Sequence, residues 1–435
     1  MSNVKALIVS VGGSPAPVIF SLNRNRPEYV IYFTSRGSRK EVREKIEPEL
    51  EFKPRDHEIL VTPDEQNLEA SVAELLREIP RLLDLWGLSF SDLVGDYTGG
   101  TKSMSAALVL ALAERGCPYS YVGGKSRSKD GLGVVQDGHE SMLFHINPWD
   151  ALAVGPCRDA QLLFNRCRFM SVRDLAARTA ARTDRHRPFF EALQHLAEGY
   201  YDWDNFNHAR ALQLLKRGES QLRSYAAASP QTGVRRFHEA VAANLPLLEG
   251  ITQELGRLVK SNPGKKDKAE PVGDTSLLVM DLIANAIRRA EIEFKYDDAV
   301  TRLYSAVEKL AKHRLLVAYG INNSSVDLAK VPEALHGELE SCANDREGGK
   351  IQIPLHKSYE LLSALGDPLG TTYMVQAEEL RKVLGVRNMS LLAHGFTPVS
   401  EETYRKLLAI ALDFLGLTVE ELPRLPNLDF GGEGL

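Results

Sequence analysis

Cysteine is scarce in this sequence and never stands at the spacing of a metal or redox site. The 435 residues include four cysteines, and no two of them form a CxxC motif. Structural zinc sites and thioredoxin-like sites both depend on such closely spaced thiols. We therefore expect no bound metal, no cofactor and no disulfide framework, and this cysteine usage favours a reducing cytoplasm.

Long apolar runs are also missing. No stretch approaches the roughly 20 consecutive apolar residues that cross a bilayer. The first apolar run, Ala6–Val11, follows a single lysine and ends at Gly12, so it is a candidate β-strand rather than a secretory signal. The expectation is a cytoplasmic chain that makes no contact with a membrane.

An excess of positive charge is absent as well. The chain has 53 lysines and arginines against 58 aspartates and glutamates, which gives a formal net charge of -5. Proteins that bind nucleic acids over a broad surface are usually basic. Any contact with a nucleic acid must therefore come from a local patch.

The first 150 residues alternate short apolar runs with helical stretches. Strands that alternate with helices predict a mostly parallel sheet in an α/β Rossmann-like domain. Ligands on such sheets bind beyond the carboxyl ends of the strands. A later run around the turn signal Asp137-Gly138 predicts a β-hairpin. The candidate strands are Ala6–Val11, Tyr29–Phe33, Glu58–Val61, Leu93–Asp96 and Tyr119–Val122.

Beyond about residue 150 the strand patterns fade, and helical spacing continues to the end of the chain. The segment SNPGKKDKAEPVGD, residues 261–274, is rich in proline, glycine and lysine and is the best internal boundary. We therefore predict an α/β domain over residues 1–148, a helical connector over 149–274 and an all-α bundle over 275–435.

Glycine-rich turns follow the first and fourth candidate strands. Paired glycines let a ligand approach the backbone, and the free N–H groups that begin a helix attract an anion. This is not a P-loop, because the Walker pattern needs glycine directly before the lysine. A tight βα turn that needs glycine for its own geometry is the alternative. The candidate ligand contacts are Gly12, Gly13, Ser14, Thr98, Gly99, Gly100, Thr101 and Lys102.

The segment DYTGGTKSMSAAL, residues 96–108, resembles the signature loop of CRISPR-associated Rossmann-like (CARF) domains. The segment SVGGSPAPVI, residues 10–19, resembles the loop after their first strand, and the resemblance spans about the first 145 residues. It implies that the eight loop residues contact a ring of 3′–5′-linked adenylates in the groove of a homodimer. Rings of four and six adenylates both suit a two-fold groove, and cyclic tetra-adenylate is the one that we expect.

Near the C-terminus, helical spacing predicts a helix over Val375–His394, and polar residues interrupt its apolar face. Arg387 and His394 are seven positions apart and therefore project from nearly the same face. A histidine can move protons at a ribose 2′-hydroxyl, an arginine can hold a phosphate, and Asn388 can orient either group. An arginine–histidine pair that arises by chance and merely caps a helix bundle is the alternative. The face reads Ala377, Leu380, Leu384, Arg387, Leu391 and His394.

The pattern Arg-Asn-x5-His in a helical C-terminal domain resembles the motif of HEPN ribonucleases. The stretch YDDAVTRLYSAVE, residues 296–308, resembles an earlier helix of the same domain, so the resemblance spans about residues 275–420. It implies that two motifs, one per subunit, face each other across a homodimer. Arg302 and Glu308 on the earlier helix could support the site, but surface ion pairing is the favoured interpretation.

Together the resemblances imply a cyclic-oligoadenylate-activated, metal-independent endoribonuclease of type III CRISPR defence. It would cut single-stranded RNA by 2′-hydroxyl attack and leave a 2′,3′-cyclic phosphate, with Arg387, Asn388 and His394 as catalytic residues. The alternative is a ligand-responsive CARF regulator whose helical C-terminal region binds a partner without catalysis. A further interpretation is that the CARF site slowly degrades its own activator.

Overall fold

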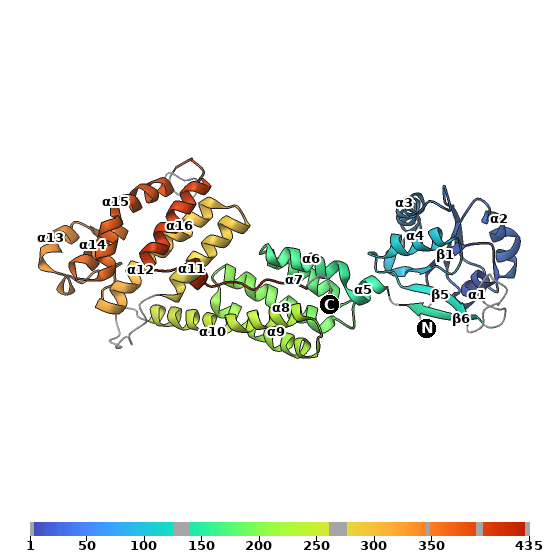
Figure 1. The fold of residues 1–435 in the computed structure, drawn as a ribbon, viewed down its shortest axis with the longest axis horizontal. Helices are drawn as coiled ribbons and strands as arrows, with labels where there is room; N and C mark the ends of the chain where they lie inside the picture. Colours follow the sequence, from blue (N-terminus) through green and yellow to red (C-terminus); the bar gives the residue numbers. More distant parts are fainter. Residues whose placement is uncertain are drawn as a thin grey trace. The chain divides into compact units, whose positions relative to one another are not determined.

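The computed structural model describes residues 4–124, 140–145, 147–260, 276–344, 349–388 and 395–430. Its described residues form two compact units. Figure 1 labels their helices and strands along the chain. The first unit is drawn from residues 1–160, 175–191 and 430–435, and the second from residues 161–174 and 192–429.

A six-stranded sheet forms the centre of the first unit, in the order β3-β2-β1-β4-β5-β6. The strands from β1 to β5 are parallel, and β6 runs antiparallel to β5. This arrangement confirms the predicted α/β Rossmann-like fold. The strands are β1 (Ala6–Val11), β2 (Tyr29–Thr34), β3 (Asp56–Val61), β4 (Leu93–Asp96), β5 (Tyr119–Gly124) and β6 (Glu140–His145).

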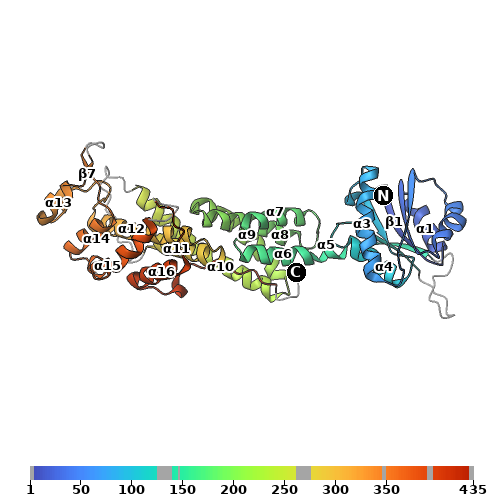
Figure 2. The ribbon, with the colours of Figure 1, turned by 90° about the horizontal axis from the view of Figure 1, so that it is seen from above.

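Helices cover both faces of this sheet (Figure 2). Ala6 and Ile8 of β1 pack in the core under α3 (Leu68–Trp86) and α4 (Lys102–Leu112), whereas Leu7 and Val9 pack against α1 (Ala16–Asn25). A strand that is buried on both faces must be apolar throughout, which explains the uninterrupted run that the sequence shows. The short helix α2 (Arg39–Glu41) follows β2.

The edge strand β3 starts two residues before the run that the sequence predicts. Asp56 and His57 are exposed, yet they pair with β2 in the parallel ladder. Polar residues are tolerated there because the strand ends the sheet. Strand β6 pairs antiparallel with β5, and the turn of the predicted hairpin, Asp137-Gly138, lies outside the described residues.

Helices dominate the rest of the chain, as predicted. Those before residue 261 are α5 (Pro148–Leu152), α6 (Val154–Asn165), α7 (Phe169–Ala180), α8 (Arg187–Asp204), α9 (His208–Ala228) and α10 (Thr232–Lys260). Those after residue 275 are α11 (Leu277–Ile287), α12 (Tyr296–Tyr319), α13 (His336–Glu340), α14 (Leu355–Ala364), α15 (Pro368–Asn388) and α16 (Glu401–Leu415). No helix within the described ranges is long and apolar enough to span a bilayer.

The helices after residue 275 share one core, built from α11, α12, α14, α15 and α16. A short two-stranded hairpin, β7 (Ala343–Asn344) with β8 (Lys350–Ile351), is a small addition to the predicted all-α bundle. Ala377 and Leu380 of α15 are buried in this core, which agrees with the inward-facing stripe expected for that helix.

Helix α15 begins seven residues before the predicted start at Val375. The carboxylate of Asp367 accepts a hydrogen bond from the backbone N–H of Leu369 at 2.9 Å, and Pro368 occupies the first helical position. Both features favour a helix start. Asp367 also accepts bonds from Arg314 and Tyr319, so the end of α12 fixes the start of the helix that carries Arg387.

Candidate functional site

The glycine-rich loops after β1 and β4 lie side by side, because these strands are neighbours at the point where the strand order reverses. The hydroxyl of Ser10 donates to the carbonyl of Gly99 at 2.6 Å. A β-carbon on Gly12 would lie 2.8 Å from the backbone nitrogen of Gly100. The topology thus brings the two predicted loops together at the switch point, where ligands of such sheets bind.

Close packing explains why some of these positions are glycine, whereas another glycine has free space around it. A β-carbon on Gly99 would lie 2.3 Å from the carbonyl oxygen of Ser10, and Gly100 has a φ of +82°. Both positions therefore require glycine for the turn itself. Gly13 and Ser14 are exposed, and a β-carbon on Gly13 would meet nothing within 4 Å. This exposed part of the loop is open to a ligand.

A buried carboxylate lies beneath the second loop. Asp96 is 0% exposed, and it accepts hydrogen bonds from Ser21 at 2.5 Å, from Ser120 at 2.8 Å and from the backbone N–H of Thr98 at 2.9 Å. These donors belong to α1, β5 and the loop, so one side chain ties three elements together. Burial raises the pKa of the Asp96 carboxyl, and the three hydrogen bonds oppose that rise.

We expect Asp96→Ala to lower the free energy of unfolding by about 3 kcal/mol, because it leaves a buried N–H and two hydroxyls without an acceptor. Asp96→Asn should keep most of the stability, since an amide oxygen can still accept from Thr98. The folded state holds the proton to a higher pH than the unfolded chain. The carboxyl therefore contributes most stability below its unfolded pKa, near about 4, and loses it as pH rises through its folded pKa.

Denaturation by urea at a series of pH values measures both effects. Asp96→Asn should remove the decline that the wild type shows above about pH 4. A wild type and an Asp96→Asn variant with parallel pH profiles would contradict this account of the carboxyl.

The hydroxyls predicted to contact a ligand also have roles within the fold. The Thr101 hydroxyl donates to the carbonyl of Glu65 at 2.7 Å and accepts from the N–H of Met104 at 3.2 Å, so it caps α4. The Thr98 hydroxyl accepts from the N–H of Val122 at 2.9 Å. Lys102 is exposed at the start of α4, and the described residues place no carboxylate within 4 Å of its ammonium group.

Two further features belong to this sheet edge, and their residues were not among the predicted ligand contacts. The hydroxyl of Ser38, in the loop after β2, donates to the carbonyl of Val11 at 2.9 Å and so joins a third loop to the first. Tyr97 and Tyr121 stack with ring centroids 5.3 Å apart beside the second loop. The position of the Ser38 loop at the carboxyl end of a strand next to β1 was the available signal.

The second predicted site lies at the end of α15. Arg387 and Asn388 are the last two residues of this helix, and only their backbone is described. His394 lies outside the described residues. Before α16, the backbone N–H of Val399 donates to the carboxylate of Asp297 at 3.0 Å, which fixes Val399 to the first turn of α12.

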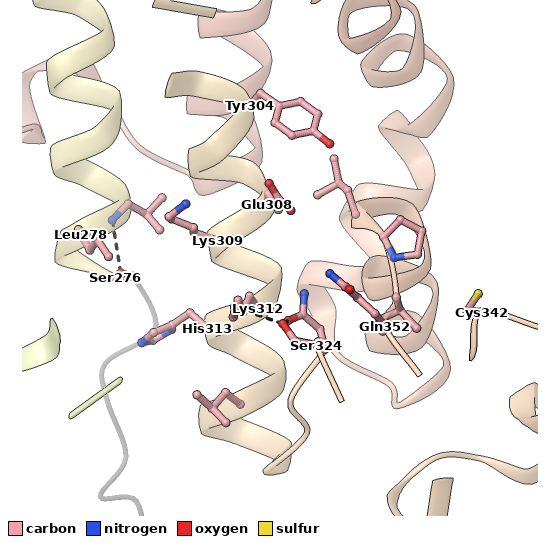
Figure 3. Close-up of a pocket in the computed structure, with 16 residues that line it drawn as sticks. Ser276, Leu278, Tyr304, Glu308, Lys309, Lys312, His313, Ser324, Cys342 and Gln352 are labelled. Atoms are coloured by element: carbon pink, nitrogen blue, oxygen red, sulfur yellow. Dashed lines mark hydrogen bonds between the residues drawn. The ribbon is translucent and has the colours of Figure 1, made fainter. Parts of the chain in front are cut away.

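The two polar residues singled out on α12 have different surroundings. Arg302 forms an ion pair with Asp298 at 3.2 Å and donates to the side chain of Asn285 at 2.5 Å, which agrees with the favoured interpretation of ion pairing. Glu308 instead lines a cavity in the same bundle (Figure 3). Within the described ranges, no three or more histidine, cysteine, aspartate or glutamate side chains are grouped so that they could hold a metal ion.

Family models match most of the helical part of the chain. Residues 271–417 match the Csm6 HEPN domain, and residues 152–248 match the Csm6 6H domain. Sequence reasoning had left the second of these segments as an unnamed connector. The HEPN match includes Arg387, Asn388 and His394.

Solved structures extend the comparison to the N-terminal unit. Enterococcus italicus Csm6, bound to cyclic hexa-2′-fluoro-hexa-dAMP, is similar with a TM-score of 0.51 and 12% identity, over 95% of this chain and 94% of that chain. Can2 from Sulfobacillus thermosulfidooxidans, in complex with cyclic tetra-adenylate, has a TM-score of 0.24 and 11% identity, over 48% of this chain and 69% of that chain.

A search of curated proteins gave no match. The two Csm6 models together match more than half of the chain, and the structure adds the Rossmann-like sheet with its paired loops. The chain therefore belongs to the Csm6 family of CRISPR-associated CARF–HEPN effectors.

Proposed function

We propose that this chain is a cytoplasmic, homodimeric endoribonuclease that a cyclic oligoadenylate activates in type III CRISPR defence. The observation that carries the proposal is the HEPN-domain match, because its range contains the Arg-Asn-x5-His pattern that has the chemistry for cutting RNA. Single-stranded RNA is the substrate.

The proposed chemistry needs only groups of this protein and of the RNA. The ribose 2′-oxygen loses its proton and attacks the adjacent phosphorus, and the bond to the 5′-oxygen breaks as that oxygen takes up a proton. His394 moves these protons, Arg387 binds the phosphate oxygens as negative charge develops, and Asn388 orients the pair. The products carry a 2′,3′-cyclic phosphate and a 5′-hydroxyl, and no metal takes part.

The activator occupies the loops at the sheet switch point in this proposal. Gly12, Gly13 and Ser14 line one side, the loop from Thr98 to Lys102 lines the other, and a second copy completes the ring site. Thr101 acts there mainly through its backbone, since its hydroxyl caps α4. The ring shifts the equilibrium between an inactive and an RNA-cutting conformation. The size of this shift is set by how much more tightly the ring binds the RNA-cutting conformation.

An RNase assay in EDTA tests the proposal. Purified protein should cut a labelled single-stranded RNA only when a cyclic oligoadenylate is added, and the cut ends should be 2′,3′-cyclic phosphates. Ligand-stimulated cutting that requires added Mg²⁺ contradicts the metal-independent mechanism. Stable ligand binding without cutting supports the alternative, a regulator whose helical region binds a partner.

Thermal stability in the presence of each ring identifies the activator. We expect cyclic tetra-adenylate to raise the melting temperature most. A ligand that binds only the folded state adds about 2.7 kcal/mol to the free energy of unfolding at 100 times its Kd, so at equal concentrations the ring with the lowest Kd gives the largest shift. Cyclic hexa-adenylate is the comparison, since an analogue of that size is bound to the Enterococcus italicus protein. A larger shift with the six-membered ring overturns the four-membered assignment. Loss of the stimulating ring over time in a nuclease-dead variant would reveal degradation by the CARF site.

A further inference from the structure

A cavity of about 690 Å³ lies over one face of α12, within the bundle that follows residue 275 (Figure 3). The first turn of α11 forms one wall, and residues 323–324 and 352–355 form another. Its lining mixes apolar side chains such as Val279 and Leu316 with polar ones such as Asn323 and Gln352. This size and this mixture are typical of a site for a small organic group such as a nucleotide.

Two lysines on α12 give the cavity its positive charge. Lys309 and Lys312 are exposed, and Lys312 lies 3.4 Å from the hydroxyl of Ser324. Among the described residues neither ammonium group has a carboxylate within 4 Å, unlike Lys357 and Lys406 of the same bundle. Of the lining residues that the structure describes, Glu308 is the one carboxylate. The two lysines therefore outweigh it and can attract an anion.

A buried histidine adds a polar atom without a partner. His313 is 8% exposed, and its Nε2 has no hydrogen-bond partner in the part of the chain that the structure describes. The nearest carboxylate oxygen, on Glu254, is 3.9 Å away and already accepts a bond from Ser276. Burial lowers the pKa of His313, so it adds a neutral polar group rather than charge.

We propose that this cavity is an anchoring subsite for a nucleotide of the single-stranded RNA substrate, away from the bond that is cut. Lys309 and Lys312 hold backbone phosphates, while the apolar floor and the ring of Tyr304 take a base. The inference rests on the proposed ribonuclease function. In this proposal the subsite lies apart from the cleavage site, so only an RNA longer than the reacting dinucleotide fills both.

Cleavage of RNAs of two lengths by a double variant tests the subsite. Lys309→Ala with Lys312→Ala should raise KM about tenfold for an RNA of about 16 nucleotides and leave the cleavage of a dinucleotide unchanged. The slope of log K against log salt for binding a non-cleavable 2′-deoxy analogue should become shallower by about 1.4. Glu308→Gln should tighten this binding about twofold, because it removes the opposing charge.

The matched control removes two lysines that are paired elsewhere. Lys216 and Lys406 lie 2.6 and 2.8 Å from Glu249 and Glu402, so Lys216→Ala with Lys406→Ala removes the same charge outside the cavity. Equal KM values for the cavity variant and this control overturn the subsite, as does an equal loss on the dinucleotide. If the cavity variant changes the molar mass of the protein in solution but leaves the Kd for RNA unchanged, this face contacts protein rather than RNA. That result also overturns the subsite. If the wild-type protein cuts neither RNA, the proposed ribonuclease function is refuted. This outcome is distinct from the outcomes that overturn the subsite alone.

Discussion

Replacing His394 with alanine is expected to lower kcat for ligand-stimulated RNA cleavage by about 10³-fold. General acid–base catalysis by a positioned side chain contributes about 10²- to 10⁴-fold, and histidine is the only residue type in the Arg-Asn-x5-His pattern that ordinarily exchanges a proton near neutral pH. KM should change little, because the histidine acts on protons in the transition state. Single-turnover cleavage in EDTA with a saturating activator measures the effect.

Arginine variants separate charge from geometry at the same site. Arg387→Ala should cost about as much as His394→Ala, whereas Arg387→Lys should recover only part of the rate because an ammonium group lacks the bidentate fork. The activator should raise the melting temperature of all three variants as it does for the wild type. This control shows that the sensor domain is intact.

Mixed dimers test whether each subunit supplies half of the site. A dimer of an Arg387→Ala chain and a His394→Ala chain retains one arginine and one histidine, so it should cut faster than either parent homodimer. Equal cutting by wild type and His394→Ala would mean that a contaminating nuclease is present or that the imidazole has no role.

The sequence was sufficient to predict the architecture of the N-terminal unit. Strands β1 and β4 have the bounds that were expected, because each is a fully buried run that ends at a turn. Their pairing follows from the reversal of strand order, which parallel α/β sheets of this kind share. The sequence alone therefore suffices to expect that the two glycine-rich loops lie next to each other.

Which residues of those loops contact a ligand and which stabilise the fold could not be predicted. Sequence reasoning treated the Thr101 hydroxyl as a ligand contact, yet the structure uses it to cap α4. It gave no role to Asp96, whose three donors come from residues 21, 98 and 120. Contacts between residues so far apart in the chain leave no local pattern. The cavity over α12 was missed for the same reason, since its walls come from five separate segments.

The helical part shows a different limit of sequence reasoning. The stripe of α15 was correct at Ala377 and Leu380 because helical periodicity is local. The start of that helix was wrong by seven residues because Asp367, fixed by Arg314 and Tyr319, sets it from outside the helix. The partners of Arg387 and His394 across a dimer remain a prediction, since one chain carries half of the proposed site.

Two glycines of the predicted ligand site should respond in opposite ways to alanine. Gly99→Ala places a β-carbon 2.3 Å from the carbonyl oxygen of Ser10, a backbone atom of the central strand β1 that cannot move without separating β1 from β4. We expect a loss of about 3 kcal/mol in the free energy of unfolding and a Kd for the activator at least about 100-fold higher. Thermal denaturation and calorimetric titration with the cyclic oligoadenylate measure the two quantities.

Gly13→Ala is the matched control, because its β-carbon would meet nothing within 4 Å. Its stability should stay within about 0.5 kcal/mol of the wild type. Its Kd should nevertheless rise about tenfold, since the added methyl group occupies the exposed surface where a ring of adenylates would approach the backbone. If Gly13→Ala binds the activator as tightly as the wild type, the ring does not contact this loop. The glycines at positions 12 and 99 would then serve the turn alone, and the ligand site would have to lie elsewhere on the sheet edge.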